Sequence, residues 1–150
     1  MPKWYTNHVE DHTKYGKGKT NSLYAGYKEL SGAHWGLMKA AAKKRGYKFD
    51  ITIEQAWDLL VSQDNLCALS GLPIHLYGRA ASRAKQNASL DRIDNKLGYT
   101  LDNVQWVHKH LNNMKLTHSQ EYFIELCTAV AEHNKQPDVP DTLISKEIYE

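Results

Sequence analysis

Apolar residues recur at helical spacing in three separate stretches of the chain. They predict one helix over Ala33–Arg45, a second from about Ile53 to Gln63, and a third that begins after Thr117 or Ser119 and ends near His133-Asn134. The apolar positions are Trp35, Met38 and Ala41 or Ala42 in the first helix, Ile53, Ala56, Trp57, Leu60 and Val61 in the second, and Tyr122, Phe123, Leu126 and Val130 in the third. Thr52 and Gln55 have the spacing of a capping box, which marks the start of the second helix.

Between the second and third helices the pattern changes to a strand, a turn, a strand and another helix. Alternation over 88–93 predicts the first strand, 94–100 has the composition of a turn, and 104–106 predicts the second strand. In the helix that follows, Val107, Leu111 and Met114 share one face, and His108, Asn112 and Lys115 share the adjacent face. The sequence therefore predicts a ββα unit with a polar helix face beside its apolar stripe.

Length and composition narrow the class of protein. A chain of 150 residues is long enough for one domain with tails, and no apolar run approaches the roughly 20 residues that a membrane span requires. Two cysteines, Cys67 and Cys127, exclude a disulfide framework and a zinc ribbon with four cysteine ligands. The first residues lack the pattern of a secretory signal, which favours a cytoplasmic location.

Charge is distributed unevenly along the chain. Residues 1–50 carry ten Lys/Arg against four Asp/Glu, whereas residues 121–150 carry two against seven. Tyrosines and tryptophans lie among the basic residues, a combination that favours nucleic acid through phosphate neutralisation and base stacking. The lysine- and glycine-rich stretch 14–22 is expected to be an exposed arm. A solvated basic face would have the same composition, so charge alone leaves both interpretations open.

Two side chains of the ββα unit could carry chemistry. Asp91 ends the first predicted strand, and Asn112 lies on the polar face of the helix. If that face packs toward the strand, the two residues supply hard oxygen ligands that suit Mg²⁺ and leave positions for water and phosphate. Such an ion can stabilise the charge that develops on a phosphodiester. The simpler alternative is a turn residue and a surface residue.

Several motifs at fixed spacing resemble the HNH nucleases of the His-Me finger, or ββα-metal, group, and most closely its small phage-encoded members. The resemblance covers about residues 65–116, and it extends upstream to Trp35, 45–47 and 49–52. The motifs are Cys67-Ala68-Leu69-Ser70-Gly71, Ala88-Ser89-Leu90-Asp91-Arg92-Ile93-Asp94, Gly98-Tyr99-Thr100, Asp102-Asn103-Val104-Gln105-Trp106-Val107-His108-Lys109 and Asn112-Asn113-Met114-Lys115.

The resemblance implies a role for each matching position. Asp91 would be a metal ligand and Asn112 the last ligand of the motif. Asn103 would be the central asparagine that ties the loop to the ββα frame, with Gly98 and Tyr99 shaping that loop. Lys115 falls where a basic residue commonly faces the DNA backbone.

The sequence departs from the family pattern at the general base, because Arg92 stands where the histidine should be. A guanidinium is a poor proton acceptor but a good phosphate clamp, and a subgroup that includes a rare-cutting restriction enzyme shares the Asp-Arg pattern. His108 is the alternative base, and a water activated by the metal is another. Where zinc-stabilised members carry two Cys-x-x-Cys pairs, this chain has Cys67 with Ser70 and His108 with Leu111, so no structural zinc is expected. His108 could equally be a packed, hydrogen-bonded histidine.

These observations predict an α+β domain in which a ββα-metal unit is flanked by helices. The expected divisions are a basic arm (1–32), a helical DNA-binding and support region (33–64), the nuclease core with its C-terminal helix (65–135) and an acidic tail (136–150).

The expected function is metal-dependent DNA endonuclease in the cytoplasm of a bacterial cell or phage-infected host, using one Mg²⁺ or Mn²⁺ per site and leaving 5′ phosphate and 3′ hydroxyl ends. The rival is an inactive HNH-like DNA-binding module. Double-strand cleavage would require a homodimer or two visits. The expected catalytic residues are Arg92, His108 and Asn103, the metal ligands Asp91 and Asn112, and the DNA-binding residues Lys14, Lys17, Lys19, Lys43, Lys44, Arg45, Lys109 and Lys115.

Overall fold

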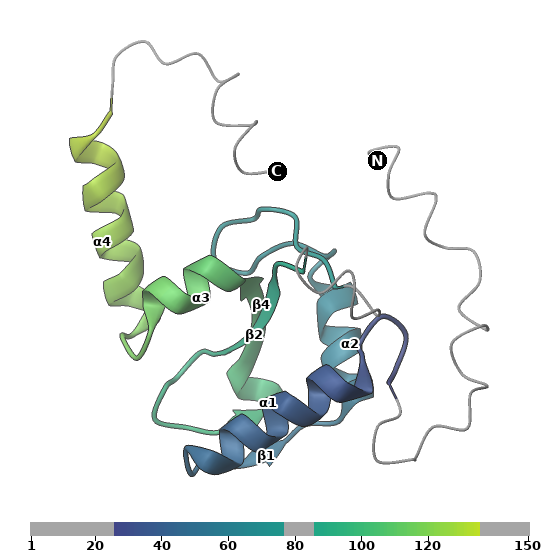
Figure 1. The fold of residues 1–150 in the computed structure, drawn as a ribbon. Coiled ribbons are helices and arrows are strands. Elements are labelled where there is room, and N and C mark those ends of the chain that lie inside the picture. Colours follow the sequence, from purple (N-terminus) through teal and green to yellow (C-terminus); the bar gives the residue numbers. More distant parts are fainter. Residues whose placement is uncertain (1–25, 77–85, 136–150) are drawn as a thin grey trace, which may run out of the picture.

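The computed structural model describes residues 26–76 and 86–135. Residues 1–25 of the predicted arm, with Lys14, Lys17 and Lys19, and the whole predicted acidic tail lie outside the described residues. The last residues of the predicted arm are folded, because Leu30 is buried in the core and Gly32 begins the first helix. Helices flank two small sheets, which confirms the predicted α+β class (Figure 1). In chain order the elements are α1 (Gly32–Lys44), β1 (Phe49–Asp50), α2 (Ile53–Ser62), β2 (Ala88–Arg92), β3 (Tyr99–Thr100), a 3₁₀ turn (Leu101–Asn103), β4 (Val104–His108), α3 (Lys109–Lys115) and α4 (Gln120–His133). Within the described residues, no helix is long and apolar enough to span a membrane.

Local capping sets the ends of the predicted helices. The Ser31 hydroxyl accepts a hydrogen bond from the backbone N–H of His34 at the start of α1, and Gly46 follows its end at a φ of 77°. At α2, Thr52 and Gln55 form both bonds of the predicted capping box. The third helix, α4, begins after Ser119, whose hydroxyl accepts from the N–H of Tyr122.

The structure contains a short parallel sheet that the sequence analysis did not predict. Residues Phe49 and Asp50 of β1 pair with Tyr99 and Thr100 of β3, a region predicted to be a turn. Strands of two residues are too short to show alternation. The pairing brings the backbone at Gly98 close to Lys48, where a Cβ on Gly98 would lie 2.5 Å from the Lys48 carbonyl oxygen. The sheet therefore fixes the loop after β2 against the segment that follows α1.

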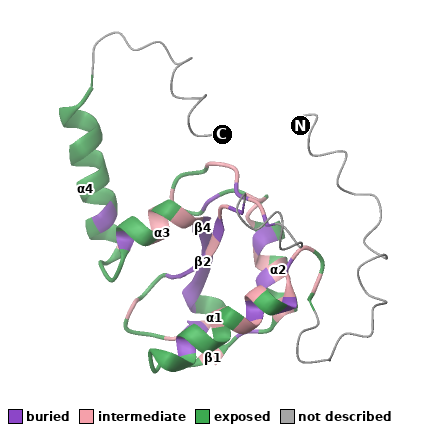
Figure 2. Cartoon of the chain, viewed as in Figure 1, coloured by how far each residue is buried: buried purple, intermediate pink, exposed green. Residues whose placement is uncertain are grey.

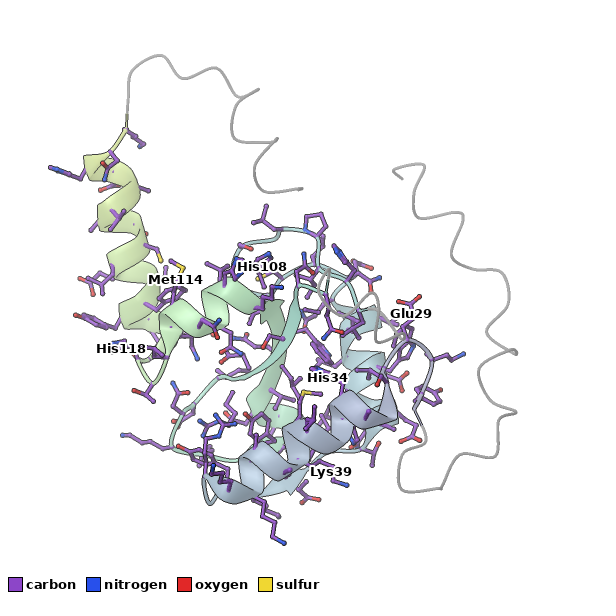
Figure 3. The ribbon with its side chains drawn as sticks, viewed as in Figure 1. Glu29, His34, Lys39, His108, Met114 and His118 are labelled. Carbon is purple, nitrogen blue, oxygen red and sulfur yellow. The ribbon has the colours of Figure 1, made fainter. Side chains whose placement is uncertain are left out.

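The ββα unit is present, but its second strand is longer than predicted. β4 pairs antiparallel with β2 along its whole length, with Ala88 opposite His108 and Ser89 opposite Val107. Val107 and His108 therefore belong to the strand, and the prediction that they begin the helix is wrong. The face of α3 that carries Asn112 and Lys115 contacts Ser89 and Asp91 of β2. Lys115 is therefore buried, whereas Met114, labelled in Figure 3, is exposed, the reverse of the predicted arrangement.

The core lies between the ββα unit and the two N-terminal helices (Figure 2). Trp106 is fully buried at its centre, and its indole N–H donates to the Ala56 carbonyl of α2 at 2.7 Å. Trp35 of α1 packs edge-on against Phe49, with ring centroids 5.1 Å apart. The buried apolar residues are Leu30, Trp35, Ala42, Ile51, Ala56, Leu60, Cys67, Ile74, Leu76, Ala88, Leu90, Tyr99, Val104, Trp106 and Val107. These contacts hold α1 against β1 and α2 against β4, and so fix both walls of the site described next.

Candidate functional site

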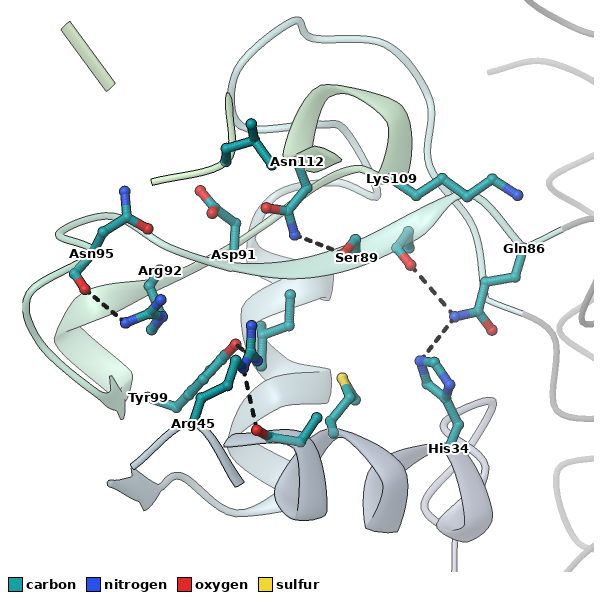
Figure 4. Close-up of a pocket in the computed structure, with 15 residues that line it drawn as sticks. His34, Arg45, Gln86, Ser89, Asp91, Arg92, Asn95, Tyr99, Lys109 and Asn112 are labelled. Carbon is teal, nitrogen blue, oxygen red and sulfur yellow. Dashed lines mark hydrogen bonds between the residues drawn. The ribbon is translucent and has the colours of Figure 1, made fainter. Parts of the chain in front are cut away.

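An open hollow of about 440 Å³ lies between α1 and the ββα unit (Figure 4). Its polar lining includes His34 and Arg45 from α1, Asp91 and Arg92 from β2, and Lys109 and Asn112 from α3. The fold therefore brings the predicted ligand positions Asp91 and Asn112 to the same surface, from a strand and a helix.

Asp91 is held from behind by two side chains. It is only 3% exposed, and one carboxylate oxygen accepts from the Gln105 amide at 3.0 Å. The other oxygen lies 3.1 Å from the Lys115 ammonium. The carboxylate is thus fixed in orientation, and part of its charge is balanced within the protein.

Asn112 faces the same hollow, with its amide oriented by a neighbour. The Asn112 amide nitrogen donates to the Ser89 hydroxyl of β2 at 2.8 Å. Figure 4 shows the amide oxygen of Asn112 turned toward Asp91. One carboxylate and one amide oxygen are therefore presented together.

Lys115 corrects a prediction. It was expected to face DNA, but its side chain is fully buried, and its ammonium donates to Asp91 and to the Arg92 carbonyl at 2.9 Å. Lys115 shares a face of α3 with Asn112, and both side chains contact β2. Lys115 therefore supports the site from inside the protein and has no surface to offer DNA.

Arg92 also has an internal role. Its guanidinium donates two bonds of 2.8 Å to the carbonyls of Asn95 and Leu97 and lies 3.6 Å from the centre of the Tyr47 ring. The residue is 6% exposed, yet it still contributes to the wall of the hollow. Arg92 thus ties the loop after β2 to the segment after α1.

Asn103 fastens the same loop from its other end. Its amide oxygen accepts from the Asp94 N–H at 2.9 Å, and its amide nitrogen donates to the carbonyls of Asp94 and Gly98 at 3.0 and 2.9 Å. The side chain is buried, and these contacts are the kind that the family resemblance implied. Asn103 is a positioning residue, since it does not line the hollow.

His108 lies away from the hollow. It caps α3, and its ring Nδ1 accepts from the His110 N–H while its backbone N–H donates to the Cys67 sulfur at 3.2 Å. Burial, followed by the positive charges of His110, Lys109 and His75, holds the pKa of His108 below the usual imidazole value. His108 lies four residues before Asn112, at the N-cap of α3, but its side chain bonds to the His110 N–H and does not line the hollow.

The sequence analysis missed a histidine at the hollow. His34 lies on the α1 side of it, where its ring nitrogen is 3.2 Å from the Gln86 amide nitrogen (Figure 4). Of the histidines that the structure describes, His34 is the one that lines the hollow, and it lies on the wall opposite Asn112. Helical spacing alone gave no signal for it, because its contact is with Gln86, 52 positions along the chain and just before β2.

Cations dominate the charged lining. Arg45 donates to the Tyr99 hydroxyl at 3.1 Å. Arg45, Arg92 and Lys109 line the hollow, and among the described lining residues Asp91 is the one with an acidic side chain. On the far side of the α1 end, a second hollow is lined by Lys39, Lys43 and Lys48 beside Tyr47 and Phe49. Lys44 is exposed on the last turn of α1. These surfaces are suited to an anionic, phosphate-bearing molecule.

The donor set for a metal ion is small. Within residues 26–76 and 86–135, no group of three or more His, Cys, Asp or Glu side chains could hold an ion. Asp91 and Asn112 offer two hard oxygens, which fits Mg²⁺ or Mn²⁺ bound mainly through water and substrate phosphate. They do not fit an ion that needs a full protein cage.

Comparisons with known proteins support the fold. No protein-family model matches the chain. The chain is 28% identical over 109 residues (73% of its length) to an uncharacterized protein of Acanthamoeba polyphaga mimivirus, and it spans 18% of that protein's length. A solved structure of the rare-cutting HNH restriction endonuclease PacI is similar with a TM-score of 0.50 at 19% identity, covering 77% of this chain and 89% of that chain. The chain thus has a fold similar to that of an HNH endonuclease.

Proposed function

We propose that this protein is a metal-dependent DNA endonuclease that hydrolyses a phosphodiester bond in the hollow between α1 and the ββα unit. The observation that carries the proposal is the pairing of the Asp91 carboxylate with the Asn112 amide oxygen on a surface otherwise lined by Arg45, Arg92 and Lys109. Two hard oxygens among cations suit a phosphate bound together with a divalent ion. The similarity of fold to an HNH endonuclease supports the same reaction class.

Asp91 and Asn112 would hold Mg²⁺ or Mn²⁺. The ion, when bound, supplies positive charge that stabilises the developing phosphorane and the leaving oxygen. Gln105 and Lys115 fix the carboxylate, and Ser89 fixes the amide, so neither ligand has to be ordered when substrate arrives. Products with a 5′ phosphate and a 3′ hydroxyl are expected from the resemblance.

The cationic side chains would hold the DNA backbone. Arg45 and Lys109 lie on opposite sides of the hollow and can reach phosphate oxygens. The lysines of the second hollow, Lys39 and Lys43, extend this surface past the end of α1, where Tyr47 and Phe49 offer aromatic faces. The basic arm with Lys14, Lys17 and Lys19 would add affinity that does not depend on sequence.

A DNA-binding module without cleavage is the second candidate. It is favoured by the Lys115–Asp91 ion pair, which balances the carboxylate charge that a metal would otherwise use, and by the engagement of Arg92 with loop carbonyls. Both candidates predict DNA binding. They differ in whether a divalent ion leads to strand breaks.

A plasmid-cleavage assay separates them. The protein is incubated with supercoiled DNA and Mg²⁺ or Mn²⁺, with EDTA as the control. Asn112→Ala removes the amide oxygen and should lower cleavage by about 100-fold or more. Asn113→Ala, at the exposed neighbouring position, and Ser89→Ala, which removes only the orienting hydroxyl, should retain most or part of the activity. DNA binding without metal-dependent nicking by the parent supports the binding module.

A further inference from the structure

The candidate ligand Asp91 is joined to a buried lysine behind the hollow. The side chains of Lys115 and Asp91 are 0% and 3% exposed, and the Lys115 ammonium lies 3.1 Å from one carboxylate oxygen. The same ammonium donates to the Arg92 carbonyl at 2.9 Å, which holds it against β2. Because solvent does not reach the pair, the positive charge of Lys115 acts on Asp91 with little screening by water or salt.

Both oxygens of Asp91 have partners inside the protein. One accepts from Lys115 and the other from the Gln105 amide, whose nitrogen also lies 2.8 Å from the side-chain oxygen of Gln120 at the start of α4. An ionised carboxylate has about four lone-pair positions, so Asp91 can still accept an ion. Its charge, however, is already balanced by Lys115.

The hollow in front of Asp91 carries further positive charge. Arg45, Arg92 and Lys109 line it, and Asn112, the other candidate ligand, is neutral (Figure 4). In the described part of the chain, no group of three or more His, Cys, Asp or Glu side chains could hold an ion. A divalent cation that approaches the free protein therefore meets repulsion from several cations and finds only two protein oxygens.

DNA would reverse this balance. A phosphate in the hollow brings negative charge to the lining cations, and its oxygens supply ligands that the protein lacks. Mg²⁺ is commonly held by one or two carboxylates together with substrate phosphates. The charge of Lys115 should therefore oppose ion binding most strongly when the hollow is empty.

Building on the proposed nuclease function, we infer that Lys115 is a positioning residue that prevents Asp91 and Asn112 from holding a divalent cation until DNA occupies the hollow. Lys115 acts through Asp91, by fixing the carboxylate and balancing its charge. Binding of DNA and of the ion is then coupled, and each tightens the other by the same factor. The ion pair is thus compatible with an enzyme whose ion is bound together with its substrate.

Manganese binding tests the inference without measuring cleavage. Free Mn²⁺ gives an electron paramagnetic resonance signal that is lost when the ion binds. The DNA-free parent should bind Mn²⁺ weakly, and a short mixed-sequence DNA duplex should tighten its binding by about tenfold or more, after subtraction of the duplex alone. Asn112→Ala lacks the amide oxygen and should show no such gain.

Lys115→Gln isolates the effect of the charge. The glutamine amide can donate to Asp91 but is neutral, so the DNA-free variant should bind Mn²⁺ about tenfold or more tightly than the DNA-free parent. A merely structural role predicts weaker binding, because a poorly ordered carboxylate is a poorer ligand. Lys96→Gln removes one charge from an exposed position outside the hollow and should leave Mn²⁺ binding unchanged.

Thermal unfolding gives a second measurement. Mn²⁺ without DNA should raise the melting temperature of Lys115→Gln and leave that of the parent unchanged, because an ion stabilises only the folded state that binds it. If Lys115→Gln is largely unfolded, Mn²⁺ should restore its folding. Failure of Mn²⁺ to stabilise this variant would overturn the inference.

The other outcomes separate the inference from the proposed function. Tight Mn²⁺ binding by the DNA-free parent would overturn the inference and leave a metal-dependent nuclease in place. A folded Lys115→Gln protein that binds Mn²⁺ no better than the parent, while DNA still tightens binding to the parent, would show that another feature of the hollow limits binding. No binding by the parent with DNA or by Lys115→Gln would contradict both the inference and the proposed metal site.

Discussion

The ammonium of Lys115 lies 3.1 Å from a carboxylate oxygen of Asp91, and neither side chain is open to solvent. The pair joins the end of α3 to β2 directly behind the hollow. Removing two charges from water has a large desolvation free energy. The attraction between them offsets it because the Gln105 amide and the Arg92 carbonyl supply further hydrogen bonds. Asp91 is therefore part of the folded framework as well as a candidate ligand.

Removing either partner should destabilise the protein. Asp91→Ala removes the carboxylate that pairs with the buried Lys115 ammonium and leaves that charge without its partner. Both Asp91→Ala and Lys115→Met should lower the free energy of unfolding by about 3–5 kcal/mol, whereas the double variant Asp91→Leu/Lys115→Met should lie close to the parent. Denaturant unfolding measures this, with Lys109→Met as the control from the partly exposed start of α3. Lys115→Met as stable as the parent would mean that the pair adds nothing.

The error over Lys115 shows where sequence reasoning stops. The run 106–109 can end a strand or begin a helix, and its apolar spacing suits both. What decides is pairing with β2, in which Ser89 and Ala88 hold Val107 and His108 in the sheet. The polar face of α3 contacts β2 through Asn112 and Lys115, so Lys115 lies inward and Met114 outward. Local signals such as the capping box of α2 were read correctly because they need no distant partner.

Long-range packing explains the rest of what was missed. His34 reaches the hollow only because α1 lies beside β2, and the β1–β3 sheet depends on two pairs of residues about fifty positions apart. Neither relation leaves a periodic trace in the chain. The pairing of Asp91 with Asn112 was anticipated because both belong to one compact ββα unit, whose order along the chain limits how it can fold.

Arg92 is expected to stabilise the loop after β2. Arg92→Lys keeps the charge but cannot donate to both the Asn95 and Leu97 carbonyls in the planar geometry that also stacks on Tyr47. The variant should lose about 1.5–3 kcal/mol of unfolding free energy, and Tyr47→Leu about 0.5–2 kcal/mol. Arg45→Lys, at an exposed arginine beside the same hollow, is the control. Unchanged stability of Arg92→Lys with weakened DNA binding would assign Arg92 to the phosphate instead.

Replacing each of two glycines by alanine should change the stability of the protein in opposite directions. A Cβ at Gly98 would lie 2.5 Å from the Lys48 carbonyl oxygen, so Gly98→Ala should disturb the β1–β3 sheet and destabilise by about 1–3 kcal/mol. A Cβ at Gly36, within α1, meets no atom within 4 Å, and Gly36→Ala should stabilise by about 0.5–1 kcal/mol. Thermal unfolding checks both variants. Equal effects at the two positions would contradict the close approach at Gly98.

Stability should fall on mild acidification because of His108. Its folded-state pKa is lowered by burial and by His110, Lys109 and His75, so the unfolded chain binds this proton more readily than the folded chain. The contribution is fully present above the unfolded imidazole value of about 6.5 and is lost as pH falls through the lowered pKa. His108→Asn keeps a side-chain acceptor for the α3 cap but cannot titrate. Unfolding at several pH values should show a flatter profile for this variant than for the exposed control His133→Asn, and parallel profiles would contradict the assignment.

Substitutions of His34 and His108 should have different effects on the rate of DNA cleavage. His34 lines the hollow, whereas His108 is absent from its lining and lies on the Cys67 side of β4. If imidazole takes the proton of the attacking water, His34→Ala should lower the cleavage rate by about 10²–10⁴-fold, and His108→Asn, with its cap retained, should cleave within a few fold of the parent. Rates measured under single-turnover conditions, with DNA affinity and folding checked for each variant, give the comparison. If the folded His108→Asn protein loses cleavage and His34→Ala does not, His108 is the general base, as the sequence analysis suggested. Parental rates in both variants would exclude His34 and His108 from this proton transfer.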